Sequence, residues 1–258
     1  MRTSRGELDG KIAIVTGAGT GIGRAIAKLF AVEGAQVVLA GRRDATLSKV
    51  AAEIVEAGGT AIALAGDVGE EAYARALVEE ATGRFGGLDI AVNNAGIMGP
   101  MGETPSIGLD DWQATLETNL TGGFLGAKYQ IPAMLKRGGG TIIFVSSFVG
   151  HTVALPGMAA YSASKSGLIG LMKALAVEYG PRGIRINALV PGGTQTPMAE
   201  AFMTSDEVRE FVRNLYALKR IADPAEQARA ALFLVSDAAS FVTGSAMLVE
   251  GGVSVNRT

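Results

Sequence analysis

Short apolar runs alternate with helix-length segments along the whole chain, and this alternation constrains the fold more than any other feature. The runs are Ile12–Thr16, Gln36–Ala40, Thr60–Ala65, Asp89–Asn93, Thr141–Val145, Arg185–Leu189 and Ala246–Val249. Runs such as IAIVT and TIIFV are apolar at consecutive positions, which is typical of strands buried on both faces. We therefore expect a doubly wound, Rossmann-type α/β fold, with a parallel sheet of about seven strands and helices on both faces.

The 258 residues contain no repeat, low-complexity tract or linker, so we expect one domain over residues 1–258. We expect residues 1–8 to form a flexible N-terminal tail. Residues 191–220 interrupt the alternation with a methionine-containing segment and predict a mobile substrate loop. No run approaches the ~20 apolar residues of a membrane span, and the first residues lack the apolar core of a secretion signal. The simplest expectation is a cytoplasmic protein without membrane contact.

Charge and composition exclude several classes of function. The chain has 23 basic and 25 acidic residues, mixed along its length, so nucleic acid is not an expected partner. It has no cysteine and one histidine, His151, which argues against a zinc site, any other metal site and a Ser-His-Asp triad. Redox chemistry would therefore need a bound cofactor. We expect His151 at the surface, with a place in the substrate pocket as the open alternative.

The first strand runs into the glycine-rich segment TGAGTGIG at residues 16–23, which an amphipathic helix follows from Arg24 to about Val32. Glycines at this point let the backbone turn tightly and approach a pyrophosphate. The helix N-terminus offers unpaired N–H groups and a partial positive charge. Glycine turns also connect strands to helices for steric reasons alone. This motif is therefore interpreted together with the later motifs of the chain.

The spacing of Gly17, Gly21 and Gly23 resembles that of the short-chain dehydrogenase/reductase family, and further motifs match the family in order along nearly the whole chain. The similar branch comprises 3-oxoacyl-carrier-protein reductases and related carbonyl reductases and alcohol dehydrogenases. The resemblance implies a nicotinamide-dependent oxidoreductase and a homodimer or homotetramer. In the glycine loop it implies cofactor contacts at Gly17, Thr20, Gly21, Ile22 and Gly23.

The second strand ends at Gly41-Arg42-Arg43, without the carboxylate that would bind the adenine ribose of NAD and repel a 2′-phosphate. Arg42 is suited to charge-assisted bonds with that phosphate, and Arg43 to stacking on adenine, although both could be solvated loop residues. We expect NADP(H) to be preferred and NAD(H) to remain possible. Thr20 argues the other way, because relatives that prefer NADP often carry a basic residue there.

Two further strand ends match cofactor-contacting motifs of the family. The resemblance assigns adenine contacts to Asp67 and Val68, and an ordinary loop aspartate would look the same. Asn93-Asn94-Ala95-Gly96 matches the family's NNAG motif, which is partly structural and partly lines the ribose site. Within it, the expected cofactor contacts are Asn93, Ala95 and Gly96.

Tyr161 and Lys165 lie four residues apart in a segment of helical spacing, Met158 to Tyr179, and so share one face. A tyrosine pKa near 10 must fall by ~3 units to act near neutrality, which is roughly 4 kcal/mol in favour of the phenolate. An ammonium at ~5 Å supplies about 3 kcal/mol at an effective dielectric constant near 20. Lysine is therefore sufficient in order of magnitude. By resemblance, both residues also contact the nicotinamide ribose.

Ser147 follows the fifth strand and matches the family's substrate-orienting serine, with Ser146 as its main competitor. Asn119 interrupts a good helix pattern from about Leu109 to Met134. In the family this position bends the helix and holds a water that hydrogen-bonds the lysine. The resemblance therefore makes Asn119, Ser147, Tyr161 and Lys165 the catalytic residues.

The segment PGGTQTPM at residues 191–198 resembles the family's grip on the nicotinamide carboxamide, which implies cofactor contacts at Pro191, Gly192, Thr194 and Thr196. A simple Pro/Gly turn is compatible with this role. Residues 240–244 and 250–252 resemble the family's C-terminal sheet edge, which also serves in subunit contact. Four methionines flank the expected active-site loops and could line the pocket, although core packing is their usual role: Met98, Met101, Met198 and Met203.

These patterns predict hydride transfer between NAD(P) and a carbonyl or secondary alcohol, most simply in an NADPH-dependent ketone or 3-oxoacyl reductase acting on a small molecule. An NAD-dependent dehydrogenase of a sugar, polyol or cyclic diol is the alternative. A dinucleotide-binding sensor or scaffold without chemistry is a second class, against which the four catalytic residues argue. Epimerase or dehydratase chemistry would need another glycine spacing and a longer chain.

Overall fold

A computed structural model describes residues 6–257, and within this range seven parallel strands form one sheet. Their order across the sheet is β3-β2-β1-β4-β5-β6-β7. The strands are β1 (Ile12–Thr16), β2 (Gln36–Gly41), β3 (Thr60–Ala65), β4 (Ile90–Asn93), β5 (Gly140–Val145), β6 (Ile184–Pro191) and β7 (Ala246–Val249). The predicted strands and fold class are confirmed, with ends that differ by one or two residues.

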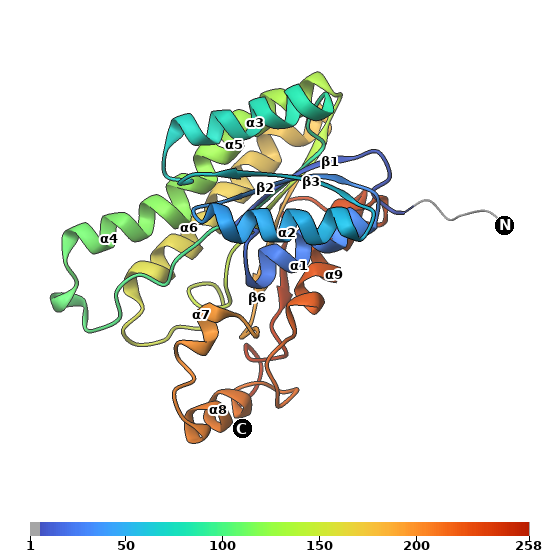
Figure 1. Ribbon diagram of the computed structural model, residues 1–258. Helices are drawn as coiled ribbons and strands as arrows, with labels where there is room; N and C mark the ends of the chain where they lie inside the picture. The colour runs from blue at the N-terminus through green and yellow to red at the C-terminus, as the bar shows by residue number, and fades with distance from the viewer. Residues whose placement is uncertain (1–5, 258) are drawn as a thin grey trace.

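Helices cover both faces of the sheet (Figure 1). One face carries α1 (Gly21–Val32), α2 (Asp44–Glu56) and α9 (Pro224–Val235), and the other carries α3 (Glu71–Phe85), α5 (Gly122–Lys136) and α6 (Ala159–Tyr179). The helix α4 (Leu109–Leu116) lies beside α6. Two short helices, α7 (Pro197–Glu200) and α8 (Asp206–Asn214), project away from the sheet.

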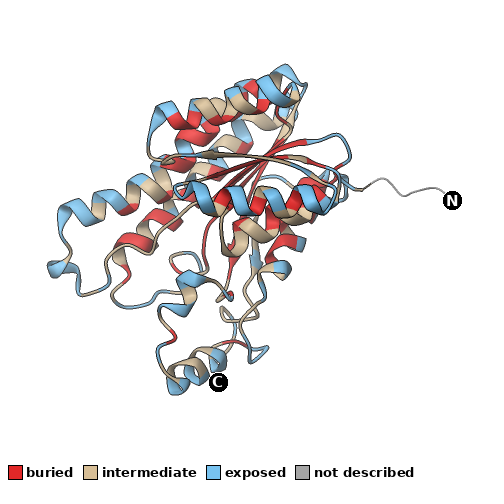
Figure 2. Ribbon diagram, in the orientation of Figure 1, coloured by how far each residue is buried: buried red, intermediate tan, exposed pale blue. Residues whose placement is uncertain are grey.

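Alternation along each strand builds two separate cores. In β1, Ala13 and Val15 belong to the cluster with α1, α2 and α9, whereas Ile12 and Ile14 belong to the cluster with α3, α5 and α6. All four side chains are nearly inaccessible to water. Figure 2 shows the same pattern, with buried strands between helices that expose only their outer faces. Two-sided burial therefore explains the continuous apolar runs.

The strand order reverses direction beside β1, where β2 pairs on one side and β4 on the other. The connections leaving these two strands consequently run to opposite faces of the sheet and open a crevice at their carboxyl ends. Ligands of open α/β sheets bind in such a crevice. The fold thus places the glycine-rich segment after β1 and the asparagine pair after β4 side by side.

The helix predicted from Leu109 to Met134 is interrupted as expected. A π-helical turn at Glu117–Thr121 separates α4 from α5 and contains Asn119. The first helix, α1, begins at Gly21, three residues before the predicted start at Arg24.

The prediction of a flexible tail over residues 1–8 is wrong for its last residues. Leu8 is 1% exposed and belongs to the core beneath α1 and α2. Its amide donates to the Glu33 carbonyl at 2.9 Å, and the Glu7 amide donates to the Glu33 carboxylate at 3.0 Å. A single apolar side chain next to polar neighbours gives no local sign that it is buried. Residues 1–5 lie outside the described range.

The segment at residues 191–220 contains more structure than the sequence predicts, because α7 and α8 lie within it. The hydroxyl of Thr196 accepts from the Ala199 amide and caps α7, and the hydroxyl of Ser205 accepts from the Val208 amide and caps α8. Over residues 6–257, no helix is both long and apolar enough to cross a membrane.

We expect Leu8→Ala to lower the free energy of unfolding by about 2–5 kcal/mol, because it opens a cavity in the core. Chemical denaturation followed by circular dichroism measures the change. Leu109→Ala is the matched control, because Leu109 is 68% exposed and its truncation is expected to change stability by no more than about 0.5 kcal/mol. Equal effects of the two substitutions would show that Leu8 contributes nothing to the core.

Candidate active site

A cavity of about 760 Å³ follows the carboxyl edge of the sheet, from the glycine loop to the segment that carries α7 and α8. It is continuous, so residues from the first and last quarters of the chain share one space. It includes most of the residues that the sequence singled out. Side chains of Asn93 and Asn119 and the backbone of Gly23 are the exceptions.

Thr16 and Asn94 join the ends of β1 and β4 at the reversal point. The Thr16 hydroxyl accepts from the amides of Asn94, at 2.9 Å, and Ala95, at 3.0 Å. The Asn94 side-chain amide donates to the carbonyl of Thr16 at 2.8 Å. These bonds hold the backbone of the glycine loop against the start of the next loop.

The glycines of the first loop serve two different purposes. Gly17 and Gly21 have φ angles of +65° and +54°, which favour glycine, and both line the cavity. A Cβ on Gly23 would lie 2.3 Å from the carbonyl oxygen of Gly17. Gly23 therefore permits close contact between helix and loop; it does not line the cavity, and its expected cofactor contact stays a prediction.

Asn93 is also outside the set of residues that line the cavity. Its side chain is 7% exposed and forms two 3.0 Å hydrogen bonds with the side chain of Gln130 on α5. It lies two residues after Ala91 and therefore on the same face of the strand, beneath α5. The side chain of Asn94, which the sequence assigned no contact, reaches the cavity instead.

At one end of the cavity lie the residues predicted to contact the adenosine. Arg42 and Arg43 follow β2 with exposed side chains, and neither forms an ion pair with another described residue. Asp67 and Val68 follow β3 and are half-buried. The Asp67 carboxylate accepts from the Gly69 amide at 2.9 Å, which sets its direction. This end therefore combines two unpaired guanidinium groups with one oriented carboxylate.

Ser147, Tyr161 and Lys165 converge at the middle of the cavity. All three are buried, with 6%, 9% and 4% exposed. The Lys165 ammonium donates to the carbonyl of Val145 at 2.9 Å and lies 5.8 Å from the centroid of the Tyr161 ring. The Ser147 side chain lies close enough to the Tyr161 hydroxyl to act on its pKa. One end of α6 and the end of β5 thus bring three functional groups together.

The geometry separates Ser147 from its competitor. The hydroxyl of Ser146 donates to the carbonyl of Lys165 at 2.8 Å and is used in fixing α6. The hydroxyl of Ser147 accepts from the Val149 amide at 3.1 Å, so its own proton remains available for the group beside Tyr161. A hydroxyl of this kind can hold an oxygen atom of a ligand.

Burial dominates the proton affinities at this site. It raises the pKa of Tyr161, against which the nearby Ser147 side chain acts. It lowers the pKa of Lys165 to about 8. Burial thus acts against the expected lowering of the tyrosine pKa. Near neutrality Tyr161 is a protonated phenol, able to donate a proton.

Asn119 supports the site without facing the cavity. Its side-chain oxygen accepts from the Ile97 amide at 2.8 Å, and its side-chain nitrogen donates to the Ile97 carbonyl at 2.8 Å and to Ser164 at 3.0 Å. These bonds use the side chain alone, and the expected role of Asn119 in holding a water beside Lys165 stays a prediction. Asn119 joins the loop after β4 to α6 and is a positioning residue.

Gly96, in the loop after β4, lies close to the side chains of Lys165 and Asn119. A Cβ on this residue would lie 3.2 Å from both the Lys165 nitrogen and the Asn119 side-chain oxygen. Any larger residue would therefore displace the lysine. Ala95 and Gly96 both line the cavity, as predicted.

At the far end, the segment after β6 lines the cavity with Pro191, Gly192, Thr194 and Thr196. The Thr194 hydroxyl donates to the Gly192 carbonyl at 3.0 Å and accepts from the buried side chain of Gln227. The same Gln227 nitrogen donates to the carbonyl of Val249 at 2.9 Å. The helix α9 thus holds the turn after β6 to the end of β7.

Two further residues of the site, Gln227 and Tyr216, are not predicted from the sequence. Tyr216 lines the cavity, its hydroxyl accepts from the Gly193 amide at 2.8 Å, and its ring lies edge-on to Phe148 with centroids 6.4 Å apart. Neither residue belongs to a motif, so only their contacts reveal them. By contrast, all four methionines that the sequence placed near the site line the cavity, and His151 is exposed outside it.

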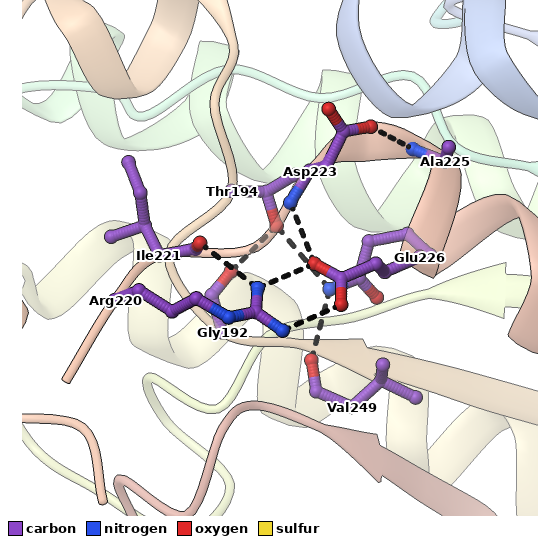
Figure 3. Close-up of polar contacts among 9 residues, drawn as sticks. Gly192, Thr194, Arg220, Ile221, Asp223, Ala225, Glu226 and Val249 are labelled. Carbon is purple, nitrogen blue, oxygen red and sulfur yellow. Dashed lines mark hydrogen bonds and ion pairs between the residues drawn. The ribbon is translucent and has the colours of Figure 1, made fainter. Parts of the chain in front are cut away.

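Arg220, at the end of the segment of residues 191–220, forms an ion pair with Glu226 on α9 (Figure 3). The guanidinium donates to both carboxylate oxygens, at 2.7 and 2.8 Å. Glu226 also accepts from the Asp223 amide at 2.9 Å, as part of the capping box of α9. The pair holds the pKa of Glu226 down to about 2, chiefly through the hydrogen bonds from Arg220.

Known proteins share both the sequence pattern and the fold. Residues 17–254 match the family model described as enoyl-(acyl carrier protein) reductase. A 2,5-dichloro-2,5-cyclohexadiene-1,4-diol dehydrogenase of Sphingobium indicum is 41% identical over 250 residues, which cover 95% of this chain and 98% of the relative.

Two solved structures superimpose closely. One is a short-chain type dehydrogenase/reductase of Mycobacterium marinum, with a TM-score of 0.92 and 37% identity over 96% of this chain and 97% of the other. The second is a 3-ketoacyl-(acyl-carrier-protein) reductase of Brucella melitensis complexed with NADH, with a TM-score of 0.90 and 37% identity over 96% and 100%.

The chain belongs to the short-chain dehydrogenase/reductase family. It is therefore an oxidoreductase that acts on alcohol or carbonyl groups with a nicotinamide dinucleotide. The cavity of this short-chain dehydrogenase/reductase fits that cofactor. The first amides of α1 have no side-chain cap and no acidic residue in the first turn, which leaves them open to a pyrophosphate.

We expect Arg220→Met to raise the pKa of Glu226 towards its ordinary value of 4.5. A carboxyl group with a lowered pKa stabilises the fold above pH 4.5, and this contribution is lost as the pH falls through about 2. The melting temperatures of wild type and variant should therefore differ more at pH 6 than at pH 3.

Arg213→Met is the control, because the Arg213 guanidinium donates to a backbone carbonyl, that of Arg209. Its effect on the melting temperature should not change over the same pH range. A difference between wild type and Arg220→Met that is equal at pH 6 and pH 3 would contradict the assignment.

Proposed function

We propose that the protein transfers a hydride between NADP(H) and a ketone or secondary alcohol, with Tyr161 exchanging the proton of the reacting oxygen. One observation carries the proposal. A buried tyrosine, serine and lysine meet within a cavity whose other end is a glycine loop at a helix N-terminus. The nicotinamide supplies or takes the hydride when bound.

The side chains support ketone reduction as follows. The Ser147 hydroxyl holds the substrate oxygen, and the adjacent Tyr161 donates its proton to that oxygen. Burial raises the tyrosine pKa and keeps this proton in place until charge develops on the oxygen. The Lys165 ammonium, held by the Val145 carbonyl, then stabilises the negative charge left on the phenol. Alcohol oxidation is the reverse.

The proposed preference for NADP(H) rests on Arg42. Arg42 directly follows β2, and in dinucleotide folds the end of this strand lies beside the adenine ribose. Neither flanking residue, Gly41 or Arg43, is acidic. A 2′-phosphate would receive charge-assisted hydrogen bonds there. Thr20 supplies no second positive charge, and the reductase of Brucella melitensis is a complex with NADH, so NAD(H) is the competing cofactor.

An NAD-dependent oxidation of a cyclic diol is the second candidate, which the diol dehydrogenase of Sphingobium indicum favours. A homodimer or homotetramer and a cytoplasmic location stay predictions. A sensor without chemistry is the non-enzymatic alternative, and it would not need a tyrosine, serine and lysine in contact.

We expect Tyr161→Phe to lower kcat about 10²–10⁴-fold on a panel of ketones and secondary alcohols, because the proton donor is lost. Ser147→Ala should cost about 10²–10³-fold, since one bond to the reacting oxygen disappears. Ser146→Ala is the matched control and should cost much less. Cofactor absorbance at 340 nm follows turnover. Unchanged turnover in Tyr161→Phe would favour the sensor.

We expect Arg42→Ala to lower kcat/KM for NADPH roughly 10–100-fold, the worth of one charge-assisted hydrogen bond, and to leave kcat/KM for NADH within about threefold. Arg84→Ala serves as the control, because Arg84 pairs with Glu80 on α3 and does not line the cavity. A wild-type enzyme that prefers NADH would contradict the proposed cofactor.

A further inference from the structure

The cavity continues beyond Ser147 and Tyr161 into a region walled almost entirely by apolar side chains. We call these side chains the apolar wall. They come from the loop after β4, the loop before α6 and the segment that carries α7 and α8. Their chief members are Met98, Met101, Leu155, Met158, Met203 and Leu215.

Contacts between the three segments make this wall one surface. Met98 and Phe148 pack against the small cluster formed by Val149, Met158 and Tyr161. The Gly102 amide donates to the Gly157 carbonyl at 3.1 Å, which joins the first two segments. The ring contact between Phe148 and Tyr216 joins the second to the third. The apolar wall therefore begins at the catalytic tyrosine.

Charge is confined to the other parts of the cavity. Among the described residues, the charged side chains that line it are Arg42, Arg43, Asp67 and Lys165. The first three lie at the ends of β2 and β3, and the lysine is at the catalytic centre. No guanidinium, ammonium or carboxylate of the described residues faces the apolar wall.

Hydroxyl groups on this side also bind the protein's own backbone. Those of Tyr216 and Thr196 accept from the backbone amides of Gly193 and Ala199, and that of Ser146 donates to the Lys165 carbonyl. Tyr216 and Thr196 keep their own protons as donors, so beyond Ser147 and Tyr161 a substrate with several hydroxyl groups would find few partners and, among the described residues on this side, no charged one. Buried polar groups without partners weaken binding strongly.

We infer that the substrate is an uncharged, mainly apolar ketone or secondary alcohol, whose reacting oxygen is its main hydrogen-bonding group. This inference rests on the proposed function. A sugar acid would bring a carboxylate into an uncharged, apolar space, and a phosphopantetheine thioester would bring amides and a phosphate. The wall contains the flexible side chains of Met98, Met101, Met158 and Met203, which accommodate rings of different size.

The test compares kcat/KM for cyclohexanone and 2-decalone with kcat/KM for 5-ketogluconate and the N-acetylcysteamine thioester of acetoacetate, each with NADPH and NADH. We expect the cyclic ketones to be better by at least roughly 100-fold, since the apolar wall offers the polar groups of the other two no partner. Equal or better use of 5-ketogluconate or the thioester overturns the inference.

A charge placed in the wall tests the same point from the protein side. Leu155 is 37% exposed and lines the cavity, so Leu155→Asp puts a short carboxylate there without opening the core. We expect kcat/KM for cyclohexanone to fall about tenfold or more through KM, with an unchanged Kd for the cofactor. Leu109→Asp, which lies outside the cavity, should leave kcat/KM unchanged. A Leu155→Asp enzyme with unaltered KM overturns the inference.

Failure of the proposed function is distinguishable from failure of this inference. Absence of Tyr161-dependent turnover on every carbonyl would refute the proposed reaction. Calorimetric binding of cyclohexanol and gluconate to the protein with NADP then tests the wall directly. Tighter binding of cyclohexanol supports the inference, whereas tighter binding of gluconate, or no binding of cyclohexanol, overturns it.

Discussion

The hydrogen bonds between Thr16 and the Asn94 segment are the contact on which the site depends. They join the ends of β1 and β4, where the strand order reverses and the two following connections diverge. Because a parallel sheet directs all its carboxyl ends to one edge, every functional loop meets at this junction. The glycine loop, the cofactor cavity and the catalytic tyrosine are arranged around it.

Burial then decides the chemistry. A tyrosine and a lysine in water would differ little in pKa from free side chains, and attraction between them would favour the phenolate. Inside the cavity, loss of hydration raises the pKa of Tyr161 and lowers that of Lys165 to about 8. Burial therefore favours the neutral form of both groups and keeps the proton on the phenol until charge develops on a bound oxygen. Ser147 and the Val145 carbonyl hold them in place.

The cavity itself has two regions, which are suited to different ligands. Its polar end presents backbone amides, two arginines and a carboxylate, as a dinucleotide requires. Its far end presents methionine, leucine and phenylalanine side chains without charge. Gln227, and the ion pair of Arg220 and Glu226, fasten the segment that forms this end to α9. Cofactor chemistry and substrate choice are thus carried by different parts of one cavity.

The sequence by itself determined the strands, the glycine loop and the Tyr161–Lys165 pair, because these depend on residues that are neighbours along the chain or one helical turn apart. Only the tertiary structure decided that Asn94 rather than Asn93 reaches the cavity, that Gly23 serves packing, that Asn119 acts through Ile97 and Ser164, and that Leu8 is buried. Each depends on contact with a distant element, such as Gln130 on α5 for Asn93. A local pattern carries no record of which strand or helix will lie beside it.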